Sequence, residues 1–450
     1  MTARSTAWQV LRDVRQHDGY ANLVLPRVLA SSSLSPADRG FATELVYGTL
    51  RLQGRYDAII ALASGRPVQE IDAGSLDILR LGCHQALALE TPAHACVNES
   101  VRLAKAVGHT RSAGFINAVM RRISGVSLID WHARVVDSAH DARGGVAQWE
   151  SHPEWVVDIL ETALRADDRA GEIGELLAAN NATPDVSLID LRRIDSPSIA
   201  PLANEEGDDR TPLSAGFAGG DPSPLLKASG GLVRVQDVGS QVAALLLGRA
   251  RPVSQGERWL DMCAGPGGKS ADLAALGAAN DVTLVSNEPT PHRLELVRQA
   301  TKPFVNVEFL EQDGRSLAVP EGSFDRVMLD APCSGLGAIR RRPESRWRKR
   351  FEDIPPLVEL QAELLEAACR YVKPGGLVAY VTCTPTLAET RLLIERVMSG
   401  RSDFRAVPVA PILENVAPGL APVTATDAVQ LWPHTHNTDG MFLSLFERSE

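Results

Sequence analysis

The chain lacks the cysteine pairs on which small zinc sites and disulfide frameworks are built. Its 450 residues include only six cysteines, and no two of them form a C-x-x-C pair. This scatter argues against both a metal site and a disulfide-stapled fold, so we expect free thiols and no metal. The six are Cys83, Cys96, Cys263, Cys333, Cys369 and Cys383.

Long apolar runs are also missing. No stretch approaches the roughly 20 apolar residues of a transmembrane helix. The first residues, MTARSTAWQVLRDVRQ, lack the apolar core and cleavage site of a secretory signal. The hydrophobic content of 44% is that of a globular protein. We therefore expect a cytoplasmic protein that does not bind membranes, and a monomer.

An overall positive charge is the third absence. The formal net charge is -10, which is unexpected for a nucleic-acid-binding protein, because phosphate contacts need lysine and arginine. Basic residues nevertheless cluster in residues 340–350, RRRPESRWRKR, where seven of eleven positions are basic and Trp347 lies among them. This segment is either a solvated charged face or a phosphate-binding site.

The length and the apolar pattern predict several domains, since 450 residues exceed what one hydrophobic core holds. In residues 1–125 apolar side chains recur at helical spacing, as in residues 7–14. Ser35 followed by Pro36 is typical of a helix N-terminus. We predict an all-α domain over residues 1–125.

The rest of the chain divides into three further regions. Residues 126–180 continue as a helical connector. Residues 181–235 alternate short β-prone pieces such as VSLIDLRRI with a Pro-, Gly- and acid-rich stretch, which predicts a small α+β subdomain. The role of residues 190–224 stays open. From 236 to 450, strands alternate with helices, as in a doubly wound α/β domain.

Five strands are clear in the last region: RWLDMC, VTLVSNE, VNVEFLEQD, FDRVMLD and GLVAYVTCT. Each of them ends in or next to a polar residue. Because ligands bind such sheets at the carboxyl ends of the strands, we expect these polar residues to gather in one active site.

A glycine-rich turn, DMCAGPGGKS at residues 261–270, follows the first of these strands and opens a helix. Cys263 stands where a nucleotide-triphosphate loop needs glycine, and the dinucleotide spacing G-x-G-x-x-G also fails. The turn still permits close backbone approach and presents a helix N-terminus to an anion, such as the carboxylate of S-adenosylmethionine. A purely structural turn is the alternative.

Two acids follow the next two strands. Glu288 comes at the end of the second strand, where a carboxylate accepts hydrogen bonds from ribose hydroxyls in nucleoside-binding sheets. Asp313 comes at the end of the third strand, where it would orient an adenine ring. The alternative for either acid is a helix cap or a solvated turn.

Two cysteines at the ends of neighbouring strands are the sharpest signal. Cys333 lies in Asp-Ala-Pro-Cys-Ser-Gly after the fourth strand, and Cys383 lies in Thr-Cys-Thr after the fifth. A thiolate that attacks carbon 6 of cytosine activates carbon 5 toward a methyl donor, which explains why thiols would be needed. Asp330, if held protonated, would donate to cytosine N3.

The motifs DMCAGPGGKS, LDAPCSGLGAIRRRP, YVTCT and LWPHTHNTDGMF resemble the Fmu/Sun (RsmB-like) family of bacterial ribosomal RNA cytosine-C5 methyltransferases. The first region, with ADRGFATELVYGTLR and FINAVMRRI, resembles the NusB-like RNA-binding fold. The resemblance implies an all-α NusB-like domain, a small α+β subdomain and a Rossmann-like methyltransferase domain. It also implies S-adenosylmethionine as cofactor and RNA, specifically small-subunit ribosomal RNA, as substrate, with looped RNA the easiest to unstack.

The same resemblance implies roles for individual residues. Cys383 would be the nucleophile, Cys333 would assist product release, Asp330 would contact the ring, and Lys269 would lie in the pocket. The implied cofactor-binding residues are Cys263, Ala264, Gly265, Pro266, Gly267, Gly268, Lys269, Glu288, Arg293, Asp313 and Asp330. Two departures, Thr384 in place of serine and Ala388-Glu389-Thr390 in place of an acid-acid-asparagine sequence, affect contacts around the thiols.

Two other functions are compatible with the sequence. A DNA cytosine-C5 methyltransferase would use the cysteine after proline, here Cys333, but the second cysteine argues against it. A non-catalytic RNA-binding ribosome-assembly factor would keep the second domain as a scaffold, but intact cysteines and an intact cofactor turn argue against that. The sequence does not specify the target nucleotide, the number of sites, or whether the substrate is naked RNA or an assembly intermediate.

Overall fold

The computed structural model describes residues 2–17, 19–194, 205–420 and 427–450. Contacts divide the chain into two compact units. The helical unit comprises Met1–Asp158, Leu177–Ala182 and Ile339–Arg348, and the α/β unit comprises Ile159–Leu176, Thr183–Ala338 and Lys349–Glu450. The Pro-, Gly- and acid-rich stretch identified in the sequence lies partly outside the described residues. In the part of the chain described, no helix is long and apolar enough to cross a membrane.

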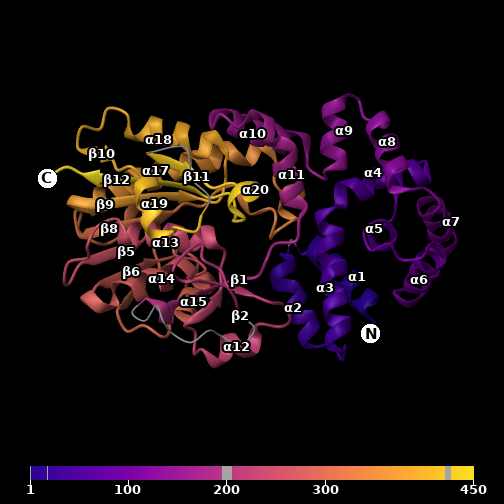
Figure 1. The fold of residues 1–450 in the computed structure, drawn as a ribbon, viewed down its shortest axis with the longest axis horizontal. Coiled ribbons are helices and arrows are strands. Elements are labelled where there is room, and N and C mark those ends of the chain that lie inside the picture. Colours follow the sequence, from indigo (N-terminus) through magenta and orange to yellow (C-terminus); the bar gives the residue numbers. More distant parts are fainter. Residues whose placement is uncertain (1, 18, 195–204, 421–426) are drawn as a thin grey trace. The chain divides into compact units, whose positions relative to one another are not determined.

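The helical unit confirms the all-α prediction for the N-terminal region (Figure 1). Its helices are α1 (Ala3–Gln16), α2 (Ala21–Ala30), α3 (Pro36–Arg51), α4 (Gln53–Ser64), α5 (Ala73–Leu87), α6 (Ala93–Ala106), α7 (Ala113–Ser124), α8 (Leu128–Ser138), α9 (Ala142–Trp149) and the short α16 (Ser345–Arg348). Two more helices, α10 (Glu154–Ala166) and α11 (Ile173–Asn181), contribute residues to both units.

Local sequence explains where these helices begin and which face they bury. Ser35 caps α3, because its hydroxyl accepts a hydrogen bond from the Asp38 amide at 3.2 Å and Pro36 takes the first helical position. On α1, Val10, Leu11 and Val14 are buried in the helical core. The apolar residues that recur at helical spacing thus pack into one continuous core.

The α/β unit is built on a mixed sheet in the order β10-β12-β9-β8-β5-β6-β7, with β11 paired to β12. The strands are β5 (Arg258–Asp261), β6 (Thr283–Asn287), β7 (Val307–Leu310), β8 (Phe324–Asp330), β9 (Val372–Thr382), β10 (Phe404–Ala406), β11 (Ala428–Gln430) and β12 (Phe442–Arg448). The five strands predicted from sequence are β5 to β9, and they run parallel. The three C-terminal strands are antiparallel additions that the sequence did not reveal.

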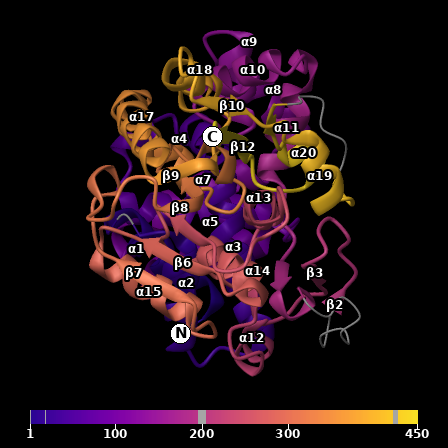
Figure 2. The same ribbon diagram turned by 90° about the vertical axis from the view of Figure 1, so that its left-hand side faces the viewer.

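Side chains along β8 alternate between two cores, as the pleat requires. Val327 and Leu329 pack in the core that includes α17 (Ile354–Tyr371), whereas Met328 packs with α13 (Val238–Arg249) and α14 (Gly268–Gly277). Figure 2 shows α17 and the pair α13 and α14 on opposite sides of β8 and β9. The remaining helices are α12 (Ser223–Ala228), α15 (Pro291–Thr301), α18 (Arg391–Met398), α19 (Ala410–Val416) and α20 (Pro433–His436).

The strand order reverses between β5 and β8. From β5 the chain adds β6 and β7 on one side, and then returns to add β8 and β9 on the other. In open α/β sheets the crevice at the carboxyl ends of the strands beside such a reversal is the usual ligand site. The residues that follow β5, β6, β8 and β9 are therefore the ones to consider.

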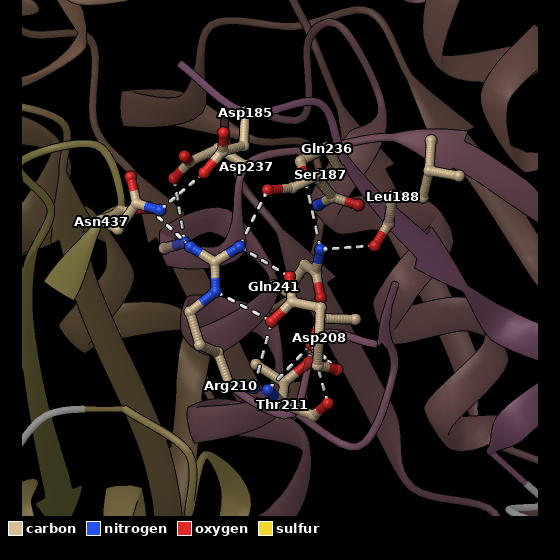
Figure 3. Close-up of polar contacts among 12 residues, drawn as sticks. Asp185, Ser187, Leu188, Asp208, Arg210, Thr211, Gln236, Asp237, Gln241 and Asn437 are labelled. Carbon is tan, nitrogen blue, oxygen red and sulfur yellow. Dashed lines mark hydrogen bonds and ion pairs between the residues drawn. The ribbon is translucent and has the colours of Figure 1, made fainter. Parts of the chain in front are cut away.

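A second, small sheet confirms the predicted α+β subdomain. Its antiparallel order is β2-β3-β1-β4, from β1 (Ser187–Asp190), β2 (Glu205–Glu206), β3 (Ser214–Phe217) and β4 (Val233–Val235). Arg210 links this sheet to the C-terminal loop, since its Nη1 donates to the Asn437 carbonyl at 2.6 Å and its Nη2 to Ser187 Oγ at 3.2 Å (Figure 3). Asp208 binds the same guanidinium.

Candidate active site

The glycine turn after β5 packs closely against the end of β6. Gly267 has a φ of +103°, and a Cβ added there would lie 2.8 Å from the Cα of Val297 in α15. A Cβ on Gly265 would lie 2.3 Å from Glu288 Oε2. At Gly267 only glycine fits, whereas a side chain on Gly265 would displace the ends of Glu288 and Arg293. The turn therefore brings residues 263–268 directly beside Glu288.

Glu288 is a buried acid at the carboxyl end of β6, with 1% of its surface exposed. Its Oε1 accepts from the Thr290 amide at 3.1 Å, and its Oε2 lies 3.3 Å from Arg293 Nη1. Arg293, on α15, also donates to the Gly265 carbonyl at 2.7 Å. The structure thus joins three of the sequence-predicted cofactor residues, Gly265, Glu288 and Arg293.

Asp313 occupies a different environment from Glu288. It follows β7 and begins a short 3-10 helix, Gly314–Ser316. Both of its carboxylate oxygens bind Arg315, and nearly half of its side chain is exposed. The Asp313 carboxylate is therefore partly exposed and paired with an arginine.

The two thiols predicted at the ends of neighbouring strands lie side by side. Cys333 Sγ and Cys383 Sγ are 3.4 Å apart. β8 and β9 are parallel and adjacent, with Asp330 opposite Val381, so the segments that leave them start together. All six cysteines of the chain are free, as expected from the sequence.

The thiol pair is polarised. The hydrogen bond between the two sulfurs lowers the pKa of Cys383, despite burial, and raises the pKa of Cys333 well above its usual value. Lys269 contributes further to lowering the Cys383 pKa. Cys383 is therefore the more acidic thiol of the pair.

Lys269 and Asp330 form an ion pair beside the thiols. Lys269 lies in the first turn of α14, and its Nζ is 2.9 Å from Asp330 Oδ2 and 3.4 Å from Ser240 Oγ. Although burial alone would lower the pKa of Lys269, Asp330 raises it above its usual value. Lys269 therefore stays charged beside the thiols.

Asp261, the last residue of β5, is a site residue that the sequence did not single out. Burial raises its pKa to about 7. Ser270 Oγ donates to its Oδ2 at 2.6 Å, whereas Oδ1 is buried and has no hydrogen-bond partner within the described chain. An orphaned buried acceptor under the glycine turn marks a position where a ligand donor would be satisfied.

A third loop, from the C-terminal motif, fixes the backbone at Cys383. The Gly337 amide donates to the Cys383 carbonyl at 2.9 Å, and the Gly440 amide donates to the Gly337 carbonyl at 2.8 Å. A Cβ on Gly337 would lie 2.0 Å from the Gly440 carbonyl oxygen. Asp237, which caps α13, accepts from the Asp439 amide at 3.1 Å. Three chain segments thus hold the Cys383 backbone.

The basic segment 340–350 is not the exposed phosphate-binding face that its charge suggested. Arg346 is fully buried within the helical unit. It donates to the carbonyl of Ser151 at 2.9 Å, to Asn181 Oδ1 at 2.9 Å and to the carbonyl of Asn180 at 3.2 Å. Arg340 is also buried, with 6% exposed. A cluster of charges in sequence was mistaken for a cluster on the surface.

The other residues of this segment also pack into the helical unit. Arg348 donates to the carbonyls of Val14 and Gly19 at 2.7 and 2.6 Å. Glu344 accepts from the Ala21 amide at 3.0 Å. A Cβ on Gly54 would lie 2.5 Å from the Trp347 ring, so the ring packs on that glycine. Arg342 and Arg350 are the exposed basic residues.

Comparison with known proteins shows the family of the chain. The model of the "16S rRNA methyltransferase RsmB/F" family matches residues 251–447, and that of the NusB family matches residues 1–125. "Putative methyltransferase Rv1407" of Mycobacterium tuberculosis is 41% identical over 448 residues, covering 99% of this chain and 96% of the relative. The chain belongs to the RsmB/F methyltransferase family.

Two further matches extend over the full length of this RsmB/F family member. "Probable ribosomal RNA small subunit methyltransferase B" of Bacillus subtilis is 30% identical, and the match covers 98% of each protein. The crystal structure of PH0851 aligns with a TM-score of 0.77 at 20% identity, covering 100% of this chain and 99% of that one. The second match shows the shared fold alone.

Proposed function

We propose that the chain methylates carbon 5 of cytosine in small-subunit ribosomal RNA, with S-adenosylmethionine as cofactor and Cys383 as covalent nucleophile. The observation that carries this proposal is the polarised thiol pair, with Sγ atoms 3.4 Å apart, at the carboxyl ends of β8 and β9. The name of the Bacillus subtilis relative supports ribosomal RNA as the substrate class.

The residues around the glycine turn fit S-adenosylmethionine. Gly265 leaves the Glu288 carboxylate uncovered by a side chain, because a Cβ there would lie 2.3 Å from it. Glu288 would accept from the ribose hydroxyls once Arg293 turns away, and Asp313 would hold the adenine. The amides of residues 263–268 and the N-terminus of α14 would face the methionine carboxylate. When bound, the cofactor supplies an electrophilic methyl group.

Cys383 begins the reaction as a thiolate. Its sulfur forms a bond to carbon 6, and the electrons of the 5,6 double bond move toward carbon 5 and N3. Lys269 and Asp330 would neutralise the negative charge that develops at N3. The Lys269–Asp330 pair, 2.9 Å apart, would supply the proton for N3.

Cys333 acts after methyl transfer. Its pKa is raised chiefly because it donates to the Cys383 sulfur. Once Cys383 is a thioether, that interaction is gone, and Cys333 can lose its proton to solvent. The Cys333 thiolate then removes the proton from carbon 5, the 5,6 double bond re-forms, Cys383 leaves as a thiolate, and N3 returns its proton to the Lys269–Asp330 pair.

The polarity of the pair disfavours the DNA-type alternative. That mechanism needs Cys333 as the thiolate, but its pKa is the one that is raised. A non-catalytic scaffold would not need a buried Lys269 beside a thiolate. Calorimetric titration with S-adenosylmethionine tests the scaffold alternative, which predicts no binding.

Covalent capture of RNA tests the proposal. In the presence of small-subunit ribosomal RNA and S-adenosylmethionine, Cys383→Ala should form no adduct and no methylated product. Cys333→Ala should methylate once and accumulate a protein–RNA complex that survives denaturing electrophoresis. A complex with Cys383→Ala but none with Cys333→Ala would reverse the two roles. Bisulfite sequencing of ribosomal RNA from cells without the gene would locate the target cytosine.

A further inference from the structure

Glu389 is a buried carboxylate close to the two thiols, and the proposed mechanism gives it no part. It ends a 3-10 helix, Leu387–Glu389, and is completely buried. Tyr380, in β9, donates its hydroxyl to the Glu389 carbonyl at 2.7 Å and so fixes the backbone. A buried ionised carboxylate is costly unless donors surround it, which makes its partners informative.

Four donors converge on the Glu389 side chain. Oε1 accepts from the Ser334 amide at 2.7 Å and from Gln361 Nε2 at 3.0 Å. Oε2 accepts from the Ser334 hydroxyl at 2.5 Å and lies 3.3 Å from the Thr384 hydroxyl. A carboxylate supplies acceptors only, so it suits four donors better than an amide does.

These donors come from both thiol loops. Ser334 directly follows Cys333, and Thr384 directly follows Cys383. Gln361, from α17, also donates to the carbonyl of Pro332 at 2.8 Å. Cys333 is therefore held on both of its flanks by the Glu389 network, whereas Cys383 has β9 and the Gly337 amide as additional supports.

We propose that Glu389 is a positioning residue. It holds Cys333 against Cys383, so that the two sulfurs can share a proton. The role in turnover rests on the proposed function. The positioning itself does not, because it concerns the free protein. Without Glu389 the Cys333 loop loses its central acceptor, while Cys383 keeps its strand.

Two variants separate positioning from general support of the fold. Glu389→Ala removes all four acceptor contacts. Glu389→Gln keeps the shape and one oxygen for the Ser334 amide and Gln361, and the hydroxyls of Ser334 and Thr384 can rotate to accept from the new amide. Glu389→Gln should therefore rescue most of what Glu389→Ala loses.

A matched control is available at the other end of the sheet. Glu257 precedes β5, is 7% exposed, and accepts from the Ser254 amide, from Trp259 Nε1 and from Arg326. Glu257→Gln also changes a buried carboxylate that has several donors in the α/β unit. Glu257 lies at the amino end of β5, whereas the thiols follow the carboxyl ends of β8 and β9. This substitution should cost stability without changing the chemistry of Cys383.

The first experiment needs no RNA. The rate at which iodoacetamide alkylates Cys383 is followed by peptide mass spectrometry as a function of pH in the full-length protein, in Cys333→Ala and in the three glutamate variants. The midpoint should rise by about one pH unit in Glu389→Ala and in Cys333→Ala. It should move less in Glu389→Gln and stay unchanged in Glu257→Gln. A wild-type midpoint in Glu389→Ala would overturn the proposal, as would a rise of equal size in Glu257→Gln.

The second experiment uses RNA and S-adenosylmethionine. Glu389→Ala should behave as a partial Cys333→Ala, with a kcat at least tenfold lower, a nearly unchanged KM for RNA and an accumulated covalent complex. Turnover lost through a higher KM, without covalent complex, would count against positioning. If Cys333→Ala itself traps no RNA, the proposed function fails, but the alkylation midpoints still decide the role of Glu389.

Discussion

Single residues around Cys383 set the pH at which it becomes reactive. Only the thiolate attacks, so the rate of alkylation or adduct formation rises with pH through the Cys383 pKa. An ordinary thiol has its midpoint near pH 8.5. Because the hydrogen bond with Cys333 lowers the pKa of Cys383, the midpoint of Cys383 should lie below that pH. The side chains around Cys383 thus make it more reactive than an ordinary thiol at neutral pH.

Lys269 adds a charge to this effect, which gives a direct prediction. Lys269→Met removes the cation that helps to lower the Cys383 pKa and leaves Asp330 unpaired, and both changes raise it. Alkylation of Cys383 at pH 7 should slow by roughly three- to tenfold, with a midpoint at higher pH. Lys373→Met, at the opposite end of β9 beside Asp325, is the control and should alkylate like wild type.

Asp261 predicts a pH dependence of stability. Its pKa is about 7 in the folded protein and near 4 in the unfolded chain, so between these values only the folded state holds the proton. The free energy of unfolding therefore falls as pH rises from 5 to 8. Asp261→Asn should remove a component of about 2–4 kcal/mol from that fall. Urea unfolding at both pH values measures it.

Asp272 supplies the comparison for this measurement. Its pKa is raised to about 6, also by burial, so some decline should remain in Asp261→Asn. An identical decline in wild type and Asp261→Asn would mean that Asp261 is ionised in the folded protein at neutral pH.

At the scale of an element, the segment Ile339–Arg348 packs as part of the helical unit. Arg346→Ala would leave the acceptors of Ser151, Asn180 and Asn181 without their donor. We expect a loss of about 3 kcal/mol or more in the stability of the helical unit. Hydrogen exchange in α9 and α11 would report it.

Arg342→Ala is the matched control for this prediction. Arg342 belongs to the same segment but is exposed, and its guanidinium lies over the Tyr20 ring at 5.3 Å. It should change stability by less than about 1 kcal/mol. Equal losses in the two variants would show that burial of Arg346 does not matter for the helical unit.

Elements whose signal is local could be predicted from the sequence. The strands β5 to β9 and the helix start at Ser35 follow from periodicity and capping residues. The thiol pair followed from two motifs at the ends of adjacent strands. By contrast, β10 and β11 have three residues each, too few for a period of two to be recognised.

Contacts between residues distant in sequence could not be predicted. Nothing near Arg346 indicates that its partners are residues 151 and 180–181, so its charge was read as surface charge. In the sequence, Glu389 is only the acid that is kept from an acid-acid-asparagine motif. The fold alone places Ser334, Gln361 and Thr384 around it. Asp261 was a strand-end acid whose burial no local pattern reveals.

At the scale of the whole molecule, the chain changes unit five times, after residues 158, 176, 182, 338 and 348. Deletion of residues 1–125 would leave Trp131 and Val135 without the rest of the helical core, and Trp347 without Gly54. We therefore expect the remaining fragment to aggregate on expression, as size-exclusion chromatography would reveal. A soluble, monodisperse fragment would show that the α/β unit folds independently.

The position of the Ile339–Arg348 segment also affects which parts of the gene can be exchanged between relatives. The gene encodes most of the NusB-family domain at its start, yet Arg346, the arginine that is buried in the helical unit, comes about 200 codons later, shortly after Cys333. A recombination event that exchanged only the 5′ part of the gene would combine the N-terminal helices of another protein with residues 339–348 of this one. Chimeras between this chain and a relative should therefore express well when residues 339–348 come from the same parent as residues 1–182, and poorly when they do not.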